Sequence, residues 1–518
     1  MKEWAIAGFV LLGLTSCIEN PQSKNPTIEY IKRPKIKKTG HTPIFDYDWL
    51  TSEIETYFLY FSSDSDLNQL DLVQNYYALH AYQPHWIDIS DTLQHAEYLS
   101  ILASADMHGL DRNTYHYDHL ATNLENLSFF YFETGEINYQ LWAESEILLS
   151  DGLILLTEHL KRGVFDPLSN EDYHYFISSK DTTFFSFGVF YAENLGDFFQ
   201  NLMPSSAHYK ALQNEYVKRL EKPESSRTNR DIDTLNTLRV NLERWRWHPL
   251  FTDIDEQVVY VNIPAFELYV LKADSVLMSS KVCVGIKRPK TYVTLYQNHL
   301  KNPENIPKPR HNETPILKDA ITYLTLNPQW RVPSEIAKNE ILRNIQKDSN
   351  YLSRMGYHVY QGNVQIDPHT VNWNAITPAN LTYRFEQSAG ELNALGKMKF
   401  MFPNKFSVYL HDTPSKNDYS RRDRAVSHGC VRVENYLELA HTLLSNIPKY
   451  DIDYLRKAIG LDKKNTKPLQ TVNVFLNPPV PIIIDYKTAW VDPFGNLHIY
   501  PDVYERDLLV LEALQSLR

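Results

Sequence analysis

The sequence predicts an α+β, multidomain chain, in which an N-terminal α-helical half precedes a β-rich half with an inserted helical segment. The chain has 518 residues, 43% of them hydrophobic, so it can bury more than one core. Through the first half, apolar residues recur at three- and four-residue spacing, which is typical of helices. Near residue 236 this pattern gives way to β-branched and aromatic runs, which are typical of strands.

Residues 46–235 are predicted to form the helical domain. The stretches "DLVQNYYALHAY", "LQHAEYLSILASADMHGL" and "ESEILLSDGLILLTEHLKRG" carry the helical period, and Gly109 and Gly163 stand where helices should end. The most apolar of these stretches contains Glu146 and Asp151. Burying such carboxylates in lipid is costly, so this segment is not expected to be a transmembrane helix.

Residues 236–460 are predicted to form the β-rich domain, and residues 461–518 to complete it with further strands and a helix. The run "EQVVYVNIPAFELYVLKADSVLMSSKVCVG" predicts about three strands, and "AITYLTL", "KFSVYLHD" and "PVPIIIDYKTAWVDPFGNLHIYPD" predict more. Helices are expected over residues 334–347 and 436–444.

The N-terminus predicts export and a lipid anchor. Residues 1–16 contain an apolar run too short to span a bilayer, which indicates a signal peptide. The "LTSC" that ends at Cys17 resembles a bacterial lipobox, in which the cysteine is lipidated and becomes the new N-terminus. The alternative is an ordinary signal peptide that happens to contain Cys17. Residues 17–45 are rich in Pro, Lys and polar residues, so they are expected to form a flexible tether.

Composition excludes several classes of partner. The formal net charge of −11 argues against a general nucleic-acid binder, which needs a broad positive field. There is no HExxH or CxxC spacing, so neither a metal nor another cofactor is expected. The sequence contains three cysteines, which are Cys17, Cys283 and Cys430. Cys283 lies in a strand-like run, where a buried hydrophobic role is expected.

The stretch "YLHDTPSKNDYSRRDRAVSHGCVRVEN", residues 409–435, concentrates nucleophilic and cationic side chains in an acidic protein. Cys430 is the candidate nucleophile, and His411, at the end of a predicted strand, is the candidate base. Neighbouring arginines are expected to favour the thiolate by lowering the cysteine pKa. The backbone amides of Gly429 and Cys430 could stabilise an oxyanion. Together these groups would support acyl transfer.

Three other interpretations of this stretch compete. His411, Asp412, His428 and Cys430 could together bind zinc, although their spacing matches no familiar ligand pattern. The arginines could form a solvated face. His428 could be a structural hydrogen-bonding residue, which we favour over a direct role in proton transfer.

These residues resemble the L,D-transpeptidase (YkuD-like) family, whose hallmark is a histidine followed, after a loop, by Ser-His-Gly-Cys and an arginine two residues later. Here the motif is His411, then residues 427–430, then Arg432. The segments "LRVNLERWRW", "VNIPAFELYV", "LNPQWRVPSEIAKNEIL" and "NALGKMKFMFPN" resemble the large periplasmic branch typified by YcbB. "YQPHWID" and "MHGLDRNTY" resemble the scaffold domain of that branch.

The resemblance implies peptidoglycan chemistry. Cys430 would attack the third residue of a tetrapeptide stem, with His411 as base and the backbone carbonyl of Asp412 orienting the imidazole. D-alanine would leave, and the thioester would pass to a neighbouring stem as a 3→3 cross-link. Residues 326–390 would form a lid over the site. The residues expected to contact substrate are Arg432, Arg424, Trp330, Tyr383 and His428; packing within the lid is an equal alternative for Trp330 and Tyr383.

The resemblance has two departures and leaves the reaction's outcome open. The small peptidoglycan-binding domain usual in this branch is not seen between the two domains, and residues 295–313 form an extra loop. The same thioester could pass to water, which would make the protein an L,D-carboxypeptidase or endopeptidase, or the chain could be a non-catalytic wall-binding lipoprotein. The expected partners are peptidoglycan stem peptides and, through the lipid, a membrane. We expect a monomer, facing the periplasm from the outer membrane.

Overall fold

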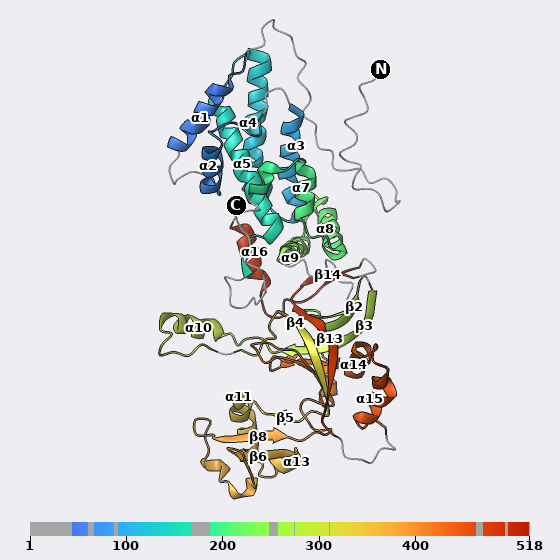
Figure 1. The fold of residues 1–518 in the computed structure, drawn as a ribbon. Helices are drawn as coiled ribbons and strands as arrows, with labels where there is room; N and C mark the ends of the chain where they lie inside the picture. Colours follow the sequence, from blue (N-terminus) through green and yellow to red (C-terminus); the bar gives the residue numbers. More distant parts are fainter. Residues whose placement is uncertain are drawn as a thin grey trace.

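The computed structural model describes residues 44–60, 67–87, 92–167, 187–247, 257–273, 275–309, 311–462, 470–492 and 496–516. A helical domain, a β-sheet domain and a smaller lid follow one another along the molecule (Figure 1). This arrangement confirms the α+β multidomain class predicted from the sequence. The predicted signal peptide, Cys17 and nearly all of the tether lie outside the described residues.

The helical domain is built around α5 (Tyr139–Arg162), which is buried along most of its length. Gly163 ends this helix with a positive φ of 84°, and Gly109, at φ 72°, ends the 3₁₀ turn η1 (Ser104–His108), as the sequence predicts. The other α-helices described in this domain are α1 (Tyr47–Tyr60), α2 (Leu70–Leu79), α3 (Thr92–Ala103), α4 (Tyr117–Phe129), α7 (Leu195–Leu202), α8 (Ala207–Leu220) and α9 (Asn229–Arg246).

The carboxylates inside α5 are compensated by hydrogen bonds. Glu146 is fully buried and accepts the backbone N–H groups of Trp86 at 2.9 Å and Ile87 at 3.0 Å, and the hydroxyl of Tyr77 at 2.7 Å. Burial raises the pKa of Glu146, because the charged form loses its hydration.

Among the described residues, no helix is both long enough and apolar enough to cross a membrane.

The second domain is a nine-stranded sheet in the order β11-β3-β12-β10-β9-β4-β13-β1-β2. β3 also pairs with β2, so the sheet closes on itself. The expected triplet is present as β1 (Gln257–Asn262), β2 (Glu267–Lys272) and β3 (Ser275–Gly285). The others are β4 (Leu317–Leu326), β9 (Met398–Met401), β10 (Leu410–His411), β11 (Ala425–Ser427), β12 (Val431–Val433) and β13 (Val472–Asp485).

The C-terminal segment contributes a strand to the same sheet. β13 lies between β4 and β1 in the sheet, and β14 (Ala489–Val491) pairs with β15 (Leu497–Ile499). Helix α16 (Asp507–Gln515) returns toward the helical domain (Figure 1). Two helices, α14 (Tyr436–Leu443) and α15 (Ile452–Ala458), lie beside the sheet.

The boundary drawn from the sequence between residues 235 and 236 falls inside α9, which runs unbroken from Asn229 to Arg246. This helix joins the two domains through buried polar contacts. Asn241 Nδ2 donates to Thr488 Oγ1 at 2.7 Å, and Arg244 donates to Asp507 at 2.6 Å. The "LRVNLERWRW" segment is therefore the last helix of the helical half and not the start of the β-rich domain.

The lid contains a sheet as well as the expected helices. Its strands lie in the order β5 (Trp330–Arg331), β8 (Tyr383–Gln387), β6 (Tyr357–Gln361) and β7 (Val364–Ile366). The helical part comprises α11 (Ser334–Ile336), the π turn η7 (Ala337–Ile341), α12 (Leu342–Lys347) and α13 (Tyr351–Arg354). The alternation in "YHVYQGNVQI", with Gly362 at φ 61°, is a hairpin signal that the sequence interpretation missed.

The extra loop forms an arm with a firm base. Helix α10 (Tyr292–Lys301) projects from the side of the sheet domain (Figure 1). At the base, the buried carboxylate of Glu313 accepts from Arg288 at 2.9 Å and from Arg506 at 3.0 Å. Two cations on one buried carboxylate hold the returning chain in place.

Candidate active site

Two neighbouring strands bring the candidate nucleophile and base together. β10 and β12 run parallel, with Leu410 opposite Val431 and His411 opposite Arg432. Leu410 and Val431 are fully buried in the core. Because side chains alternate along a strand, His411 and Arg432 face the other side, and Cys430, directly before Val431, shares that side.

The imidazole of His411 is held in one tautomer. It is buried, and its Nδ1 donates to the backbone carbonyl of Asp412 at 2.5 Å, so Nε2 remains as the acceptor. Burial lowers the pKa of His411 to about 3, and the charge of Arg432 acts in the same direction. The ring is therefore neutral at physiological pH, which is the form that can accept a proton.

Asp412 is fixed on both its backbone and its side chain. Its N–H donates to Met398 O at 2.9 Å, and its carboxylate accepts from the Lys397 N–H at 2.8 Å and from the Lys416 ammonium. A Cβ at Gly396 would lie 2.3 Å from that carboxylate. The carbonyl that orients His411 thus belongs to a residue with little freedom to move.

Cys430 is a neutral thiol in the resting site. Its Sγ lies 3.9 Å from the carbonyl of Ser407, and burial raises its pKa to about 11, although Tyr409 and Arg432 oppose that shift. The expected arginine-stabilised thiolate is therefore wrong. Cys430 and Cys283 are both free, and burial raises the pKa of Cys283 to about 11 as well.

The arginines do little to lower the pKa of Cys430, because they are paired with a carboxylate or with backbone carbonyls. Arg432 donates to Asp418 at 2.8 Å, and Arg421 lies 3.7 Å from the same carboxylate. Arg424 donates to the carbonyls of Val282 at 3.1 Å and Phe266 at 2.9 Å. The structure gives Arg424 this role between strands in place of the expected substrate contact, whereas Arg432 stays beside His411.

The turn before Cys430 is locked by hydrogen bonds. Gly429 has φ 112°, a conformation that L side chains rarely adopt, and its N–H donates to Ser427 Oγ at 3.1 Å. Ser427 in turn donates to the Cys430 carbonyl at 2.5 Å, and Thr314 Oγ1 donates to the Gly429 carbonyl at 2.9 Å. The Gly429 N–H thus already donates to Ser427 in this structure. Its role as an oxyanion donor stays a prediction.

Tyr409 is a site residue that the sequence interpretation missed. Its hydroxyl is within hydrogen-bonding reach of the Cys430 thiol and the Trp330 indole, and burial raises its pKa. Its ring centroid lies 5.7 Å from that of His411. Its place two residues before His411, on the same strand face, was the available signal.

Among the described residues, Trp330 and Glu340 link the lid to the site. Trp330 meets Tyr409, as described above, and His428 Nε2 donates to Glu340 Oε1 of the lid at 2.5 Å. His428 therefore makes a hydrogen bond to the lid, while its expected contact with substrate stays a prediction. Tyr383 packs edge-on against Trp373, with ring centroids 5.3 Å apart, within the lid's own core.

We expect Glu340→Gln to loosen the lid slightly. The side chains of His428 and Glu340 are 42% and 47% exposed, so solvent screening limits the pair to about 0.2–1 kcal/mol. Hydrogen exchange over residues 334–347 should then rise by about 1.4- to fivefold. Glu335→Gln, a lid carboxylate away from His428, is the matched control. Equal exchange in the two variants would contradict a latch between lid and site.

Comparison with known proteins agrees with this geometry. Residues 256–467 match the family described as the L,D-transpeptidase catalytic domain, and this range contains both His411 and Cys430. This match identifies residues 256–467 as an L,D-transpeptidase catalytic domain. Residues 71–215 match the family described as the Scaffold domain, which corresponds to the helical half.

A relative is similar to this chain over both the helical half and the β-rich half. The Haemophilus influenzae protein named "Putative L,D-transpeptidase" is 26% identical, over 97% of this chain and 92% of its own length. The two family matches leave residues 216–255 between them, so they agree with a helical half that ends near α9.

Proposed function

We propose that the chain is a peptidoglycan L,D-transpeptidase that forms 3→3 cross-links through a Cys430 thioester with release of D-alanine. The observation that supports this proposal most directly is the pairing of β10 and β12, which sets a neutral, oriented His411 beside the strand that carries Cys430. A neutral thiol and a neutral imidazole are suited to a proton transfer that accompanies attack.

In the first half-reaction, Cys430 Sγ attacks the carbonyl carbon of the third stem residue as His411 Nε2 takes the thiol proton. The bond between that carbonyl carbon and the nitrogen of D-alanine then breaks. His411 returns the proton to this nitrogen, so D-alanine leaves as a neutral amine and a thioester remains. Asp412 supports both steps because its carbonyl accepts from Nδ1 and stabilises the transient imidazolium.

In the second half-reaction, a side-chain amine of a neighbouring stem attacks the thioester. His411 Nε2 takes a proton from this amine and gives it to the departing sulfur, which restores the Cys430 thiol and leaves the new amide bond. Water in place of the amine would yield a shortened stem, which is the carboxypeptidase outcome.

Stem carboxylates need a cation near this face of the sheet. Lys399 lies opposite His411 in the register between β9 and β10, and its Nζ is 5.9 Å from the centre of the Tyr409 ring. Desolvation lowers the pKa of Lys399, which agrees with a partly buried position. We assign Lys399, together with Arg432, as the candidates for binding stem carboxylates.

The test is mass spectrometry of muropeptides after incubation of purified protein with tetrapeptide-bearing peptidoglycan. We expect 3→3 cross-linked dimers and free D-alanine. Shortened stems without dimers would assign the carboxypeptidase activity, and unchanged muropeptides would refute acyl transfer altogether.

Shortening the lid between Leu326 and Gly390 should lower the ratio of cross-linked dimer to hydrolysed tripeptide by about two- to tenfold. Water is far more concentrated than any acceptor amine, so a transpeptidase must limit its access to the thioester. The lid has its own core, and Trp330 connects it to Tyr409, so its loss should open the site. Both products are counted in one digest, wild type beside variant. An unchanged ratio would show that the lid has no part in this partition.

We also propose that the mature chain begins at a lipidated Cys17 and is held at the outer membrane, facing the periplasm. The supporting feature is the "LTSC" sequence followed by a Pro- and Lys-rich tether. Intact-mass measurement of envelope-purified protein should show loss of residues 1–16 and a diacylglyceryl addition on Cys17. A free Cys17 thiol, or cleavage at another residue, would contradict the anchor.

A further inference from the structure

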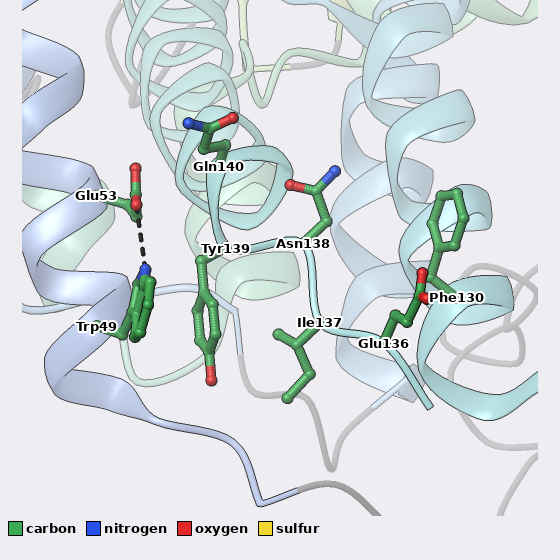
Figure 2. Close-up of a pocket in the computed structure, with 8 residues that line it drawn as sticks. All are labelled: Trp49, Glu53, Phe130, Glu136, Ile137, Asn138, Tyr139 and Gln140. Atoms are coloured by element: carbon green, nitrogen blue, oxygen red, sulfur yellow. Dashed lines mark hydrogen bonds between the residues drawn. The ribbon is translucent and has the colours of Figure 1, made fainter. Parts of the chain in front are cut away.

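The helical domain carries a hollow of about 510 Å³ far along the chain from the candidate active site. It is formed by α1 and the start of α5, at the end of the domain away from the sheet (Figures 1 and 2). Volumes of about 300–1,000 Å³ are usual for sites that take small molecules or parts of polymers. The proposed function makes no use of this hollow.

Two aromatic rings give the hollow an ordered apolar surface. Trp49 and Tyr139 lie nearly parallel, with centroids 5.6 Å apart and planes at 18°. The Trp49 indole N–H donates to Glu53 at 3.1 Å, and the Tyr139 hydroxyl accepts from the Asp46 N–H at 2.8 Å, so both rings are oriented. Trp49 is nevertheless 57% exposed. Leaving so much of a large apolar ring in contact with water is unfavourable, and is unusual for a tryptophan that serves only for packing.

The polar lining combines acceptors and donors without a cation. Glu53 and Glu136 provide carboxylates, and Asn138 and Gln140 provide amides that can both donate and accept (Figure 2). Asn138 is held by its position as the N-cap of α5, where its Oδ1 accepts from Leu141 N at 3.0 Å. Glu53, through its bond to Trp49, and Asn138 are therefore oriented beside the aromatic surface.

We propose that this hollow, which we call the Trp49 hollow, binds a neutral saccharide chain. A pyranose ring presents C–H groups on its faces, which pack on aromatic rings, and hydroxyl and acetamide groups at its edges, which suit carboxylates and amides. Anionic partners, including acidic lipid surfaces, are disfavoured because Glu53 and Glu136 line the hollow and Asp46 and Asp48 precede it.

The saccharide is the glycan strand of the cell wall, an identification that rests on the proposed function. The fit of the hollow to a neutral saccharide does not depend on that function. The helical domain would then hold a glycan strand, while the sheet domain acts on a stem peptide of the same peptidoglycan. One protein chain would therefore contact the peptidoglycan at two separate points.

The test is calorimetric titration of the detergent-solubilised full chain, carrying Cys430→Ala to prevent turnover, with a tetramer of N-acetylglucosamine. This ligand is neutral and has no stem peptide. We expect binding that is weakened about tenfold by Trp49→Ala, the range for loss of an aromatic contact, and severalfold by Glu53→Gln. Tyr191→Ala, which removes an exposed aromatic of the same domain outside the hollow, should bind like the parent.

Each alternative result is decisive. No detectable binding at millimolar tetramer, or equal binding by the Trp49, Glu53 and Tyr191 variants, would overturn the proposal, with circular dichroism used to verify that each variant is folded. Trp49-dependent binding to vesicles of phosphatidylethanolamine and phosphatidylglycerol, without tetramer binding, would make the hollow a lipid contact and refute the saccharide.

A second measurement separates this inference from the proposed function. In a chain with Cys430 intact, Trp49→Ala should reduce turnover of intact sacculi severalfold and leave turnover of a soluble disaccharide tetrapeptide unchanged. If neither substrate is turned over, the proposed function fails, whereas the tetramer titration still decides whether the hollow binds saccharide.

Discussion

Replacing Cys430 with alanine will reduce acyl transfer by about 10⁴-fold or more while the protein stays folded. Removal of a catalytic nucleophile costs on this order because the groups that remain cannot form the covalent intermediate. Cys430 is only partly buried and its Sγ lies 3.9 Å from the Ser407 carbonyl, so we expect the smaller alanine side chain to leave the fold intact. The measurement is the rate of D-alanine release, with thermal unfolding followed in parallel.

The matched control is Cys283→Ala. Cys283 is fully buried in β3, opposite Arg432, so its replacement should cost some stability and leave D-alanine release within about twofold of the parent. A carbapenem should add covalently to Cys430 and be absent from Cys430→Ala by intact mass. An adduct on Cys283, or full activity without the Cys430 thiol, would remove Cys430 from its role.

His411→Ala will lower D-alanine release by about 10²–10⁴-fold, the usual contribution of a general base. His498→Asn, which changes an exposed histidine on β15, should leave the rate unchanged. In His411→Ala the thiol has no neutral imidazole to accept its proton, so activity should recover partly at high pH, as hydroxide ionises a thiol whose pKa is about 11. A variant with wild-type rate at neutral pH would refute the assignment.

The pH profile of the wild-type chain should carry the same signature. A base must be unprotonated to act, and burial lowers the pKa of His411 to about 3. The acid limb of kcat/KM should therefore lie well below the ordinary histidine pKa near 6.5. Acid also destabilises the fold, because the unfolded chain binds a proton at His411 below about pH 6.5 while the folded chain does not. Circular dichroism therefore has to define the pH range in which the rates are compared.

Local pattern was sufficient for much of the fold. The alternating, β-branched run before Gly285 predicted β1, β2 and β3, and Gly109 and Gly163 were correctly expected to end helical segments. The strand over "KFSVYLHD" was overestimated. Ser407 has φ 56°, and Asn404 holds the backbone of the preceding turn through the Val408 N–H and carbonyl, so only Leu410 and His411 pair in β10.

Long-range contacts decided what local pattern could not. The lid sheet was missed because its strands are short and pair over up to 57 residues, from Trp330 to Gln387. The domain boundary was misplaced because α9 is helical by its own period and also packs on residues near 488 and 507, far along the chain. Neither relation is visible in a window of adjacent residues.

By itself, the sequence identified the L,D-transpeptidase catalytic domain, through a histidine followed by Ser-His-Gly-Cys and an arginine, and the family match agrees with this. Only the tertiary structure decided the charge state of those groups. Burial outweighs the nearby arginines, since Arg432 is paired with Asp418 and Arg424 with backbone carbonyls, so the thiol is neutral and the imidazole unprotonated. A pKa depends on solvation and on where each counter-charge lies, and both are properties of the folded chain.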